Sequence, residues 1–304
     1  MKHKGALMLL GTAILWGMGF VAQSAAADAV GTFTFNAARN FVGAAFLCGI
    51  IESRKRLGLD RAPDAPGSGF TARTLRLGGI ACGIMLCLAA NLQQAGIAAY
   101  PHNAAASGRA GFVTATYMVM VAMMGVFVGK RLHPSVIAAV ALALGGMYLL
   151  CVPNGLGSIY LGDWLVLGSA LGYALHILVI DRFGMVDGVR LSRLQLLTAG
   201  TISLVLALLF ENPQPTQLVA ALVPVLYAGI ASDGIAYTLQ IVGQQTTDPT
   251  VASIIMSLES VFAALGGWLV LSESLSAVEL VGCALVFAAV LLAQAPDLLS
   301  AEGV

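Results

Sequence analysis

Apolar runs of roughly 20 residues recur along almost the whole sequence, and each is long enough to cross a lipid bilayer as a helix. Only 10% of the 304 residues are charged, whereas about a quarter of an ordinary soluble domain is charged. The run from Thr250 to Leu275 carries Glu259 near its middle, where a charge facing hydrocarbon costs about 2.5 kcal/mol or more. Such a carboxylate needs protein or water around it. The sequence therefore predicts a bundle of membrane helices.

The apolar runs predict an all-α integral membrane protein with ten transmembrane helices. The single long polar connection, residues 54–73, contains Pro63, Pro66 and Gly67, which mark a loop. Connections elsewhere are short, so we expect neighbouring helices to be antiparallel. The expected helices cover about residues 4–25, 31–53, 74–97, 104–128, 135–152, 162–183, 190–210, 217–242, 248–271 and 276–295.

Basic residues predict the orientation of this bundle. They gather at the N-terminus and at even-numbered connections, and none falls at an odd-numbered connection, so both termini are expected in the cytoplasm, with the protein in the inner membrane. The first apolar run is longer than the core of a typical signal peptide, about 7 to 15 residues, and we expect it to be retained as the first helix. These basic residues are Lys2, Lys4, Arg54, Lys55, Arg56, Arg61, Arg73, Arg76, Lys130, Arg131, Arg182, Arg190 and Arg193.

Internal similarity divides the sequence into two halves, 1–152 and 153–304. Residues 10–13 match 167–170 at a shift of 157, and the LQxxG pattern at 92–96 recurs at 239–243 at a shift of 147. Residues 115–149 lie on 258–292 at a shift of 143. Because five helices per half is an odd number, we expect two inverted five-helix repeats. Substrate sites of such folds lie near the membrane midplane between the repeats.

Polar groups inside the apolar runs are the candidates for substrate binding or gating. Arg39 lies about 13 Å into its helix, near the middle of a hydrocarbon core of about 30 Å. Asp233, at a similar depth, begins a polar stripe on one helix face. As an alternative, these groups could be structural ties, with Arg39 or Arg109 neutralised by Asp233 or Glu259; Glu259 could also face a closely packed helix. The candidates are Trp16, Asn36, Arg39, Gln93, Arg109, Tyr173, His176, Asp233, Tyr237, Gln240 and Glu259.

Several classes of function have no support in the sequence. The five cysteines lie in apolar segments without CxxC or His/Cys spacing, so we expect no metal and no cofactor. HExxH, GxSxG and the ATP-binding pattern GxxxxGK[ST] do not occur. Net charge is zero and no basic block is present, so nucleic acid is not an expected partner. A membrane-embedded enzyme or a passive channel stays an alternative to a transporter.

The run SLESVFAALGGWLVLSESL at 257–275, followed by Glu279, Gly282 and Cys283, resembles the second-repeat pattern of the EamA family in the drug/metabolite transporter superfamily. Residues 109–117, leading to Gly129, Lys130 and Arg131, resemble its first-repeat counterpart, and residues 14–23 resemble its first helix. The sequence departs from the pattern at Ala122 and Ser260, where many relatives have proline.

The resemblance implies a non-enzymatic secondary transporter of small metabolites, often amino acids, that works by alternating access. The buried charges and amides suit a small polar or amino-acid-like solute, and we expect export. Proton coupling is conceivable through Asp233, Glu259 or His176, while the oligomeric state stays open. The partners expected are a small-molecule substrate and the lipid bilayer.

Overall fold

The computed structural model of the chain is helical throughout its described part, which contains no strand. The structure describes residues 2–59, 63, 70–101, 106–127, 129, 134–151 and 160–272, together with 276–278, 280–282, 284, 285, 287–289 and 292. Lys130, Arg131 and much of the expected 54–73 loop and 276–295 helix lie outside these residues. The all-α prediction is confirmed for the part that is described.

Eight of the described segments are long and apolar enough to span a membrane. Two shorter apolar helices, Pro134–Gly146 and Leu280–Ala289, lie where the fifth and tenth helices were expected; some residues of the second are outside the described part. The number ten therefore stays a prediction. The elements are α1 (Lys2–Ala26), α2 (Thr32–Arg56), α3 (Ala72–Ala98), α4 (Ala106–Ala115), α5 (Tyr117–Phe127), α6 (Pro134–Cys151), α7 (Leu161–Phe183), α8 (Gly188–Phe210), α9 (Pro215–Ala220), α10 (Leu222–Tyr227), the π-helix η2 (Ala228–Ala236), α11 (Tyr237–Gln244), α12 (Pro249–Met256) and α13 (Glu259–Leu271).

The helix expected over 217–242 is divided into four pieces, α9, α10, η2 and α11. Pro224 lacks a backbone N–H and its ring crowds the carbonyl four residues earlier, at Ala220, where α9 ends. The wider π turn then leaves carbonyls available to side chains: Ser232 O accepts from Trp16 Nε1 at 3.1 Å and Ala236 O from Thr12 Oγ1 at 3.2 Å. The interruption thus fastens this segment to α1.

The helices expected over 104–128 and 248–271 are each interrupted once, at Thr116 and at Ser257–Leu258. At both places a hydroxyl bonds a carbonyl three residues back: Thr116 Oγ1 to Val113 O and Ser257 Oγ to Ile254 O, each 2.7 Å. Such bonds compete with the helix ladder and bend helices. At the shift of 143 that relates the halves, Ser257 and Leu258 correspond to residues 114 and 115, so the two interruptions lie one to two residues from equivalent positions.

The two faces of α3 show how the sequence separates lipid from protein. Leu77, Ile80, Ile84 and Leu88 recur at helical spacing and are 43–51% exposed, as expected of a face toward lipid chains. On another face, a Cβ added at Gly83 would lie 2.7 Å from Gln195 O of α8. Small residues let membrane helices approach closely, and dispersion contacts then hold them together.

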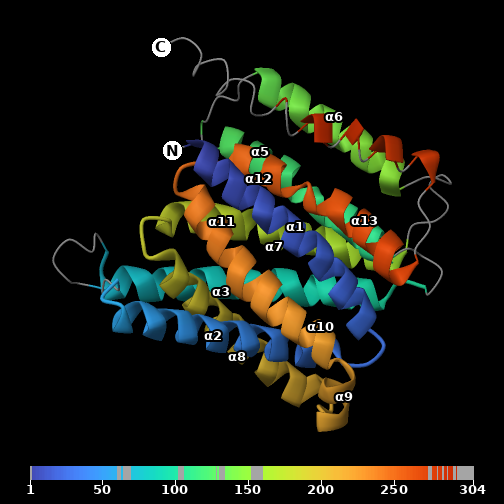
Figure 1. Ribbon diagram of the computed structural model, residues 1–304. Helices are drawn as coiled ribbons and strands as arrows, with labels where there is room; N and C mark the ends of the chain where they lie inside the picture. Colours follow the sequence, from blue (N-terminus) through green and yellow to red (C-terminus); the bar gives the residue numbers. More distant parts are fainter. Residues whose placement is uncertain are drawn as a thin grey trace.

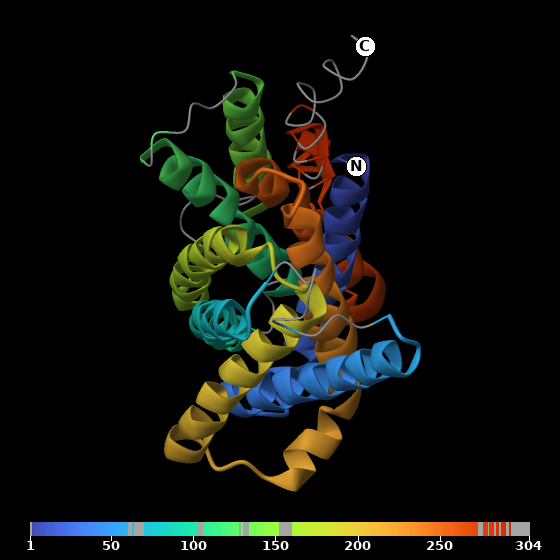
Figure 2. The ribbon, with the colours of Figure 1, turned by 90° about the vertical axis from the view of Figure 1, so that its left-hand side faces the viewer.

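The main helix contacts join the first half of the chain to the second. α3 packs against α7 and α8, α2 against α8 and η2, and α1 against α11, η2 and α13. Figure 1 shows these helices running side by side, and Figure 2 shows α3 between α7 and α8, with α6 at the top and α9 at the bottom. When each helix is replaced by its equivalent in the other half, the α3–α7 contact becomes the α1–α11 contact. In the same way, the α3–α8 contact becomes the α2–η2 contact.

Two close glycine contacts repeat the same relation residue by residue. A Cβ added at Gly5 would lie 2.9 Å from Gly243 O, and one added at Gly162 would lie 2.6 Å from Gly96 O. Gly5 and Gly162 are related by the shift of 157, and Gly96 and Gly243 by the shift of 147. Both contacts sit at the ends of their helices, on opposite ends of the bundle (Figure 1). They support the predicted repeat, which stays a prediction.

Two glycines of α7 provide a matched test of this packing. We expect Gly162→Ala to destabilise the protein by about 1–3 kcal/mol, because the added methyl group would press on the Gly96 backbone. Gly168→Ala should cause no loss, because its Cβ would meet Leu92 Cδ1 at an ordinary 3.6 Å and alanine favours helix. Thermal unfolding of both variants in detergent measures the difference; equal midpoints would show that the Gly96–Gly162 contact is not tight.

Candidate functional site

A cavity lies between the two halves of the chain. Its volume is about 20 Å³, measured as the space that the centre of a water-sized sphere can occupy. A cavity needs roughly 10–15 Å³ on this measure to hold one water, so the conformation seen here is too narrow for a metabolite. The lining residues are Trp16, Phe20, Gln23, Arg39, Gln93, Thr114, Tyr117, Tyr173, Ile177, Ser232, Tyr237, Gln240 and Glu259.

Six of the lining residues form pairs at the repeat shifts. Trp16 pairs with Tyr173 and Phe20 with Ile177 at 157, and Gln93 pairs with Gln240 at 147. Because equivalent residues of both halves line it, the cavity lies where the two halves meet. Its charged residues break this relation: Arg39 and Glu259 correspond to Leu196 and Thr116 at shifts of 157 and 143.

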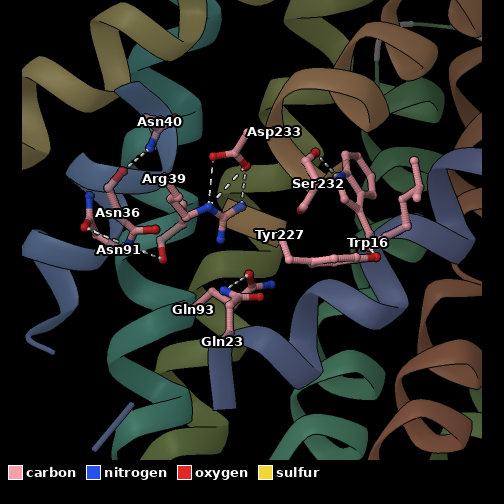
Figure 3. A network of polar contacts seen from close by, with 12 residues as sticks. Trp16, Gln23, Asn36, Arg39, Asn40, Asn91, Gln93, Tyr227, Ser232 and Asp233 are labelled. Carbon is pink, nitrogen blue, oxygen red and sulfur yellow. Dashed lines mark hydrogen bonds and ion pairs between the residues drawn. The ribbon is translucent and has the colours of Figure 1, made fainter. Parts of the chain in front are cut away.

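Arg39 and Asp233 form a buried ion pair that joins α2 to η2 (Figure 3). Arg39 Nε donates to Asp233 Oδ2 at 2.9 Å and to Oδ1 at 3.2 Å, and Nη2 donates to Oδ1 as well. The side chains are 4% and 1% exposed. Gly43 and Gly229 allow α2 and η2 to approach, because a Cβ at Gly43 would lie 2.6 Å from Gly229 O. The fork of the guanidinium is thus directed at a protein carboxylate.

Hydrogen-bonded amides form a second part of the wall. Gln23 Nε2 donates to Gln93 Oε1 at 3.0 Å, and the Tyr173 hydroxyl donates to the same oxygen at 3.1 Å. Gln93 Nε2 donates in turn to Thr114 Oγ1 at 3.0 Å. These bonds link α1, α3, α4 and α7, so a movement of one helix disturbs the others; Figure 3 shows the bond between Gln23 and Gln93.

Asn36 lies behind this wall and does not line the cavity. Its amide donates to Ala90 O at 3.1 Å and to Asn91 Oδ1 at 3.0 Å, and Asn91 donates to Ser203 Oγ at 2.9 Å. These bonds tie α2 to α3, as Figure 3 shows for Asn36 and Asn91, and α3 to α8. The structure therefore places Asn36 in a helix contact close to Arg39.

Aromatic side chains cover another side of the cavity. The rings of Trp16 and Tyr237 meet edge to face with centroids 4.9 Å apart. His176 packs behind Tyr237 at 5.7 Å, is fully buried, and has Nε2 2.9 Å from Gln195 Oε1. His176 is therefore held between its neighbours and does not line the cavity.

Glu259 lines the cavity from the first turn of α13, after the interruption at Ser257–Leu258. It is 3% exposed, and its Oε1 has no hydrogen-bond partner among the described residues. Tyr117 and Tyr173 lie near enough to interact electrostatically with this carboxylate, but Tyr117 Oη also lacks a hydrogen bond of normal geometry within the described part. Of the two orientations that the sequence left open, the structure has the one toward the cavity.

Arg109 lies apart from the cavity lining, in a clasp between α4 and the start of α7. Its Nε and Nη2 donate to the two oxygens of Asp163, each at 2.7 Å, and Tyr100 Oη donates to Asp163 Oδ1 at 2.8 Å. The guanidinium also lies over the Tyr160 ring, 4.9 Å from its centroid. The clasp closes the same end of the bundle as the Gly96–Gly162 contact.

Of the expected site residues, the structure brings Trp16, Arg39, Gln93, Tyr173, Tyr237, Gln240 and Glu259 together around the cavity, and leaves Asn36, Arg109, His176 and Asp233 outside its lining. Gln23, Thr114 and Tyr117 were missed, although Gln23 follows Trp16 at helical spacing and the other two lie in the 109–117 segment. Ser232 was missed because the π turn, which changes the angular spacing, has no marker in the sequence. No group of three or more His, Cys, Asp or Glu that could hold a metal occurs among the described residues.

Comparisons with known proteins identify related sequences and a related fold. A model of the EamA-like transporter family matches residues 3–152 and 160–294. A relative from Archaeoglobus fulgidus, described as an uncharacterized transporter, is 26% identical over 285 residues, which cover 92% of this chain and 82% of the relative. A solved structure titled "Crystal structure of protein" superposes with a TM-score of 0.73 at 20% identity, covering 95% of this chain and 98% of that one. At that identity the last likeness shows the fold alone.

The buried ion pair can be tested by a double-mutant cycle. We expect Arg39→Met or Asp233→Leu alone to cost about 3–5 kcal/mol of unfolding free energy, because each leaves an uncompensated buried charge. The double variant should be at least about 1 kcal/mol more stable than the sum of the single losses predicts. The control cycle, Lys55→Met with Glu52→Leu, removes a half-exposed pair at 3.8 Å and should show a coupling below about 1 kcal/mol. Additive losses at Arg39 and Asp233 would contradict the pairing.

Proposed function

The chain belongs to the EamA-like transporter family, and we propose that it exports small amino-acid-like or other polar solutes across the cytoplasmic membrane as a secondary transporter. The family and the eight apolar helices make it a multi-pass membrane protein and a membrane transporter. The solute, the direction and alternating access are the proposed part, as is the orientation with both termini in the cytoplasm.

The cavity between the halves is the observation that carries the proposal. It combines aromatic rings, amides and the charged side chains of Arg39 and Glu259 in one buried space. A wall of this composition can hold a polar solute that hydrocarbon would reject, because each polar group of the solute finds a partner. In inverted-repeat transporters, this place between the repeats is where the solute binds.

Alternating access is supported by close helix contacts at both ends of the bundle. At one end, α1 and α11 meet at Gly5 and Gly243; at the other, α3 and α7 meet at Gly96 and Gly162 beside the Arg109 clasp. Because the cavity is too narrow for a metabolite, the helices must separate at one end for the solute to enter. The halves share no continuous main chain at these contacts, so either end can separate while the other stays packed.

Arg39 fits a gating role in this scheme. Its partner Asp233 belongs to the other half, so relative movement of α2 and η2 must strain or re-form a two-pronged ion pair inside the protein. Asp233, Glu259 and His176 are the groups through which protons could be coupled; of these, Glu259 lines the cavity. An enzyme would convert the solute and a channel would not saturate, so flux measurements separate both alternatives from a transporter.

We expect purified protein in proteoliposomes to show saturable flux and counterflow of a solute found by thermal-shift screening. Arg39→Lys should lower that flux at least about tenfold, because lysine cannot reproduce the two-pronged bond to Asp233. Arg56→Lys, a change at a 79% exposed position, should leave the flux unchanged. Size-exclusion chromatography reports folded yield, which should be similar for all three proteins. Normal flux in Arg39→Lys would exclude the gating role; conversion of the solute would favour an enzyme and linear flux a channel.

The clasp provides a test of alternating access. In a background without the native cysteines, Thr114→Cys places a thiol in the cavity wall, where the residue is 1% exposed. Asp163→Asn keeps an oxygen for the Tyr160 N–H but removes the charge that Arg109 binds. We expect a membrane-impermeant thiol reagent added outside to label the thiol about tenfold faster in this variant, since weaker closure raises the open population. Glu52→Gln is the control, and equal labelling would show that the clasp does not close the path.

A further inference from the structure

We propose that Glu259 and the aromatic rings around it bind the ammonium group of the solute, so that the preferred substrate is a small organic amine with a net positive charge. This inference rests on the proposed function and narrows its substrate class. Three independent features of the cavity carry it: its charge balance, its aromatic wall and the unpaired oxygen of Glu259.

The charge balance of the cavity is negative when Glu259 is ionised. Arg39 is the cation of the lining, and it is neutralised by Asp233 through both Nε and Nη2. Glu259 is then left as a carboxylate without a basic side chain bonded to it in the described part of the chain. A cation entering the cavity would supply the missing charge, whereas an anion would meet repulsion in a space of low dielectric constant.

The cavity that Glu259 lines has five aromatic side chains in its wall, and two of them, Tyr117 and Tyr173, interact with its carboxylate. Trp16, Phe20, Tyr117, Tyr173 and Tyr237 all line the cavity. Ring faces attract ammonium groups by cation–π interactions, and such cages are a common way to hold organic cations. Hard metal cations such as Ca²⁺ instead take six to eight oxygen ligands, which rings do not supply. The aromatic wall thus favours an ammonium group with an apolar body.

The unpaired oxygen gives the ammonium group a defined place. Glu259 Oε1 is buried and accepts no hydrogen bond of normal geometry from the described residues; the Tyr117 hydroxyl, which interacts with this carboxylate, also lacks a partner of normal geometry. A buried acceptor without a donor is costly, so a ligand that brings N–H donors gains more here than at an exposed carboxylate. A carboxylate on the solute has no matching place, because the fork of Arg39 is already directed at Asp233.

Three probes with the same aromatic body test the assignment: 2-phenylethylamine, phenylalanine and 3-phenylpropionate, which are a cation, a zwitterion and an anion. Thermal-shift titrations of the full chain in detergent give apparent affinities without any need for flux. We expect the amine to bind at least about tenfold more tightly than the other two, the range expected for a hydrogen bond to a charged group. Glu259→Gln should remove that preference, and Glu52→Gln, a change at a half-exposed carboxylate, should keep it.

Further variants guard against loss of folding and against a merely structural effect. Glu259→Asp keeps the charge and should keep the preference for the amine, so it tests the assignment even if Glu259→Gln does not fold. Tyr173→Phe and Tyr173→Leu both lose the hydroxyl that bonds Gln93, but only the leucine loses the ring; we expect amine binding to fall severalfold further in Tyr173→Leu.

Several results would overturn the assignment: tighter binding of phenylalanine or 3-phenylpropionate, no binding by any probe, or an unchanged preference in Glu259→Gln. Each of these leaves the transporter proposal standing if counterflow is found with another solute. Absence of saturable flux for every solute, together with selective amine binding that depends on Glu259, would contradict the transporter proposal and retain the binding site.

Discussion

A pair of opposite charges held away from water, Arg39 with Asp233, determines much of what the two halves of this protein can do. Either charge alone would be costly in the interior, so α2 and η2 must stay together or exchange this bond for another. The pair also fixes the guanidinium in the cavity wall and cancels its charge. The electrostatic character of the cavity is thereby left to Glu259.

Helix contacts recur at equivalent positions of the predicted repeat, whereas the charged residues of the cavity do not. Glycine contacts and helix pairs recur when the halves are exchanged, because close approach requires only small residues at equivalent positions. The charged groups do not recur: Asp233 and Glu259 correspond to Leu86 and Thr116. Two halves that pack alike therefore surround a cavity with only one set of charges, and under the proposed function this would hold a solute in a single orientation.

The sequence predicted the helices well and their interruptions poorly. Long apolar runs locate membrane helices because only a helix satisfies its backbone in lipid. Pro224 could have indicated the end of α9, but Thr116 has no such marker, since threonine is common within membrane helices. Spacing placed Arg39 at the site; Glu259 stayed ambiguous because the turn before it breaks the angular register on which spacing arguments depend. For Arg109 the sequence offered Asp233 or Glu259 as partners, whereas the structure pairs it with Asp163 in the first turn of α7.

The difference between the two ends of the bundle has a consequence for how the protein tolerates change during evolution. Where Gly5 meets Gly243, closure depends on the absence of side chains, so almost any replacement adds atoms that hold the helices apart. Where Arg109 grips Asp163, closure depends on two particular side chains, and almost any replacement deletes one of them. Sequence change at the Gly5–Gly243 end is therefore limited by side-chain volume, and at the Arg109–Asp163 end by chemical identity. A compensating change would be a smaller neighbouring residue at the first end and an exchanged charge pair at the second.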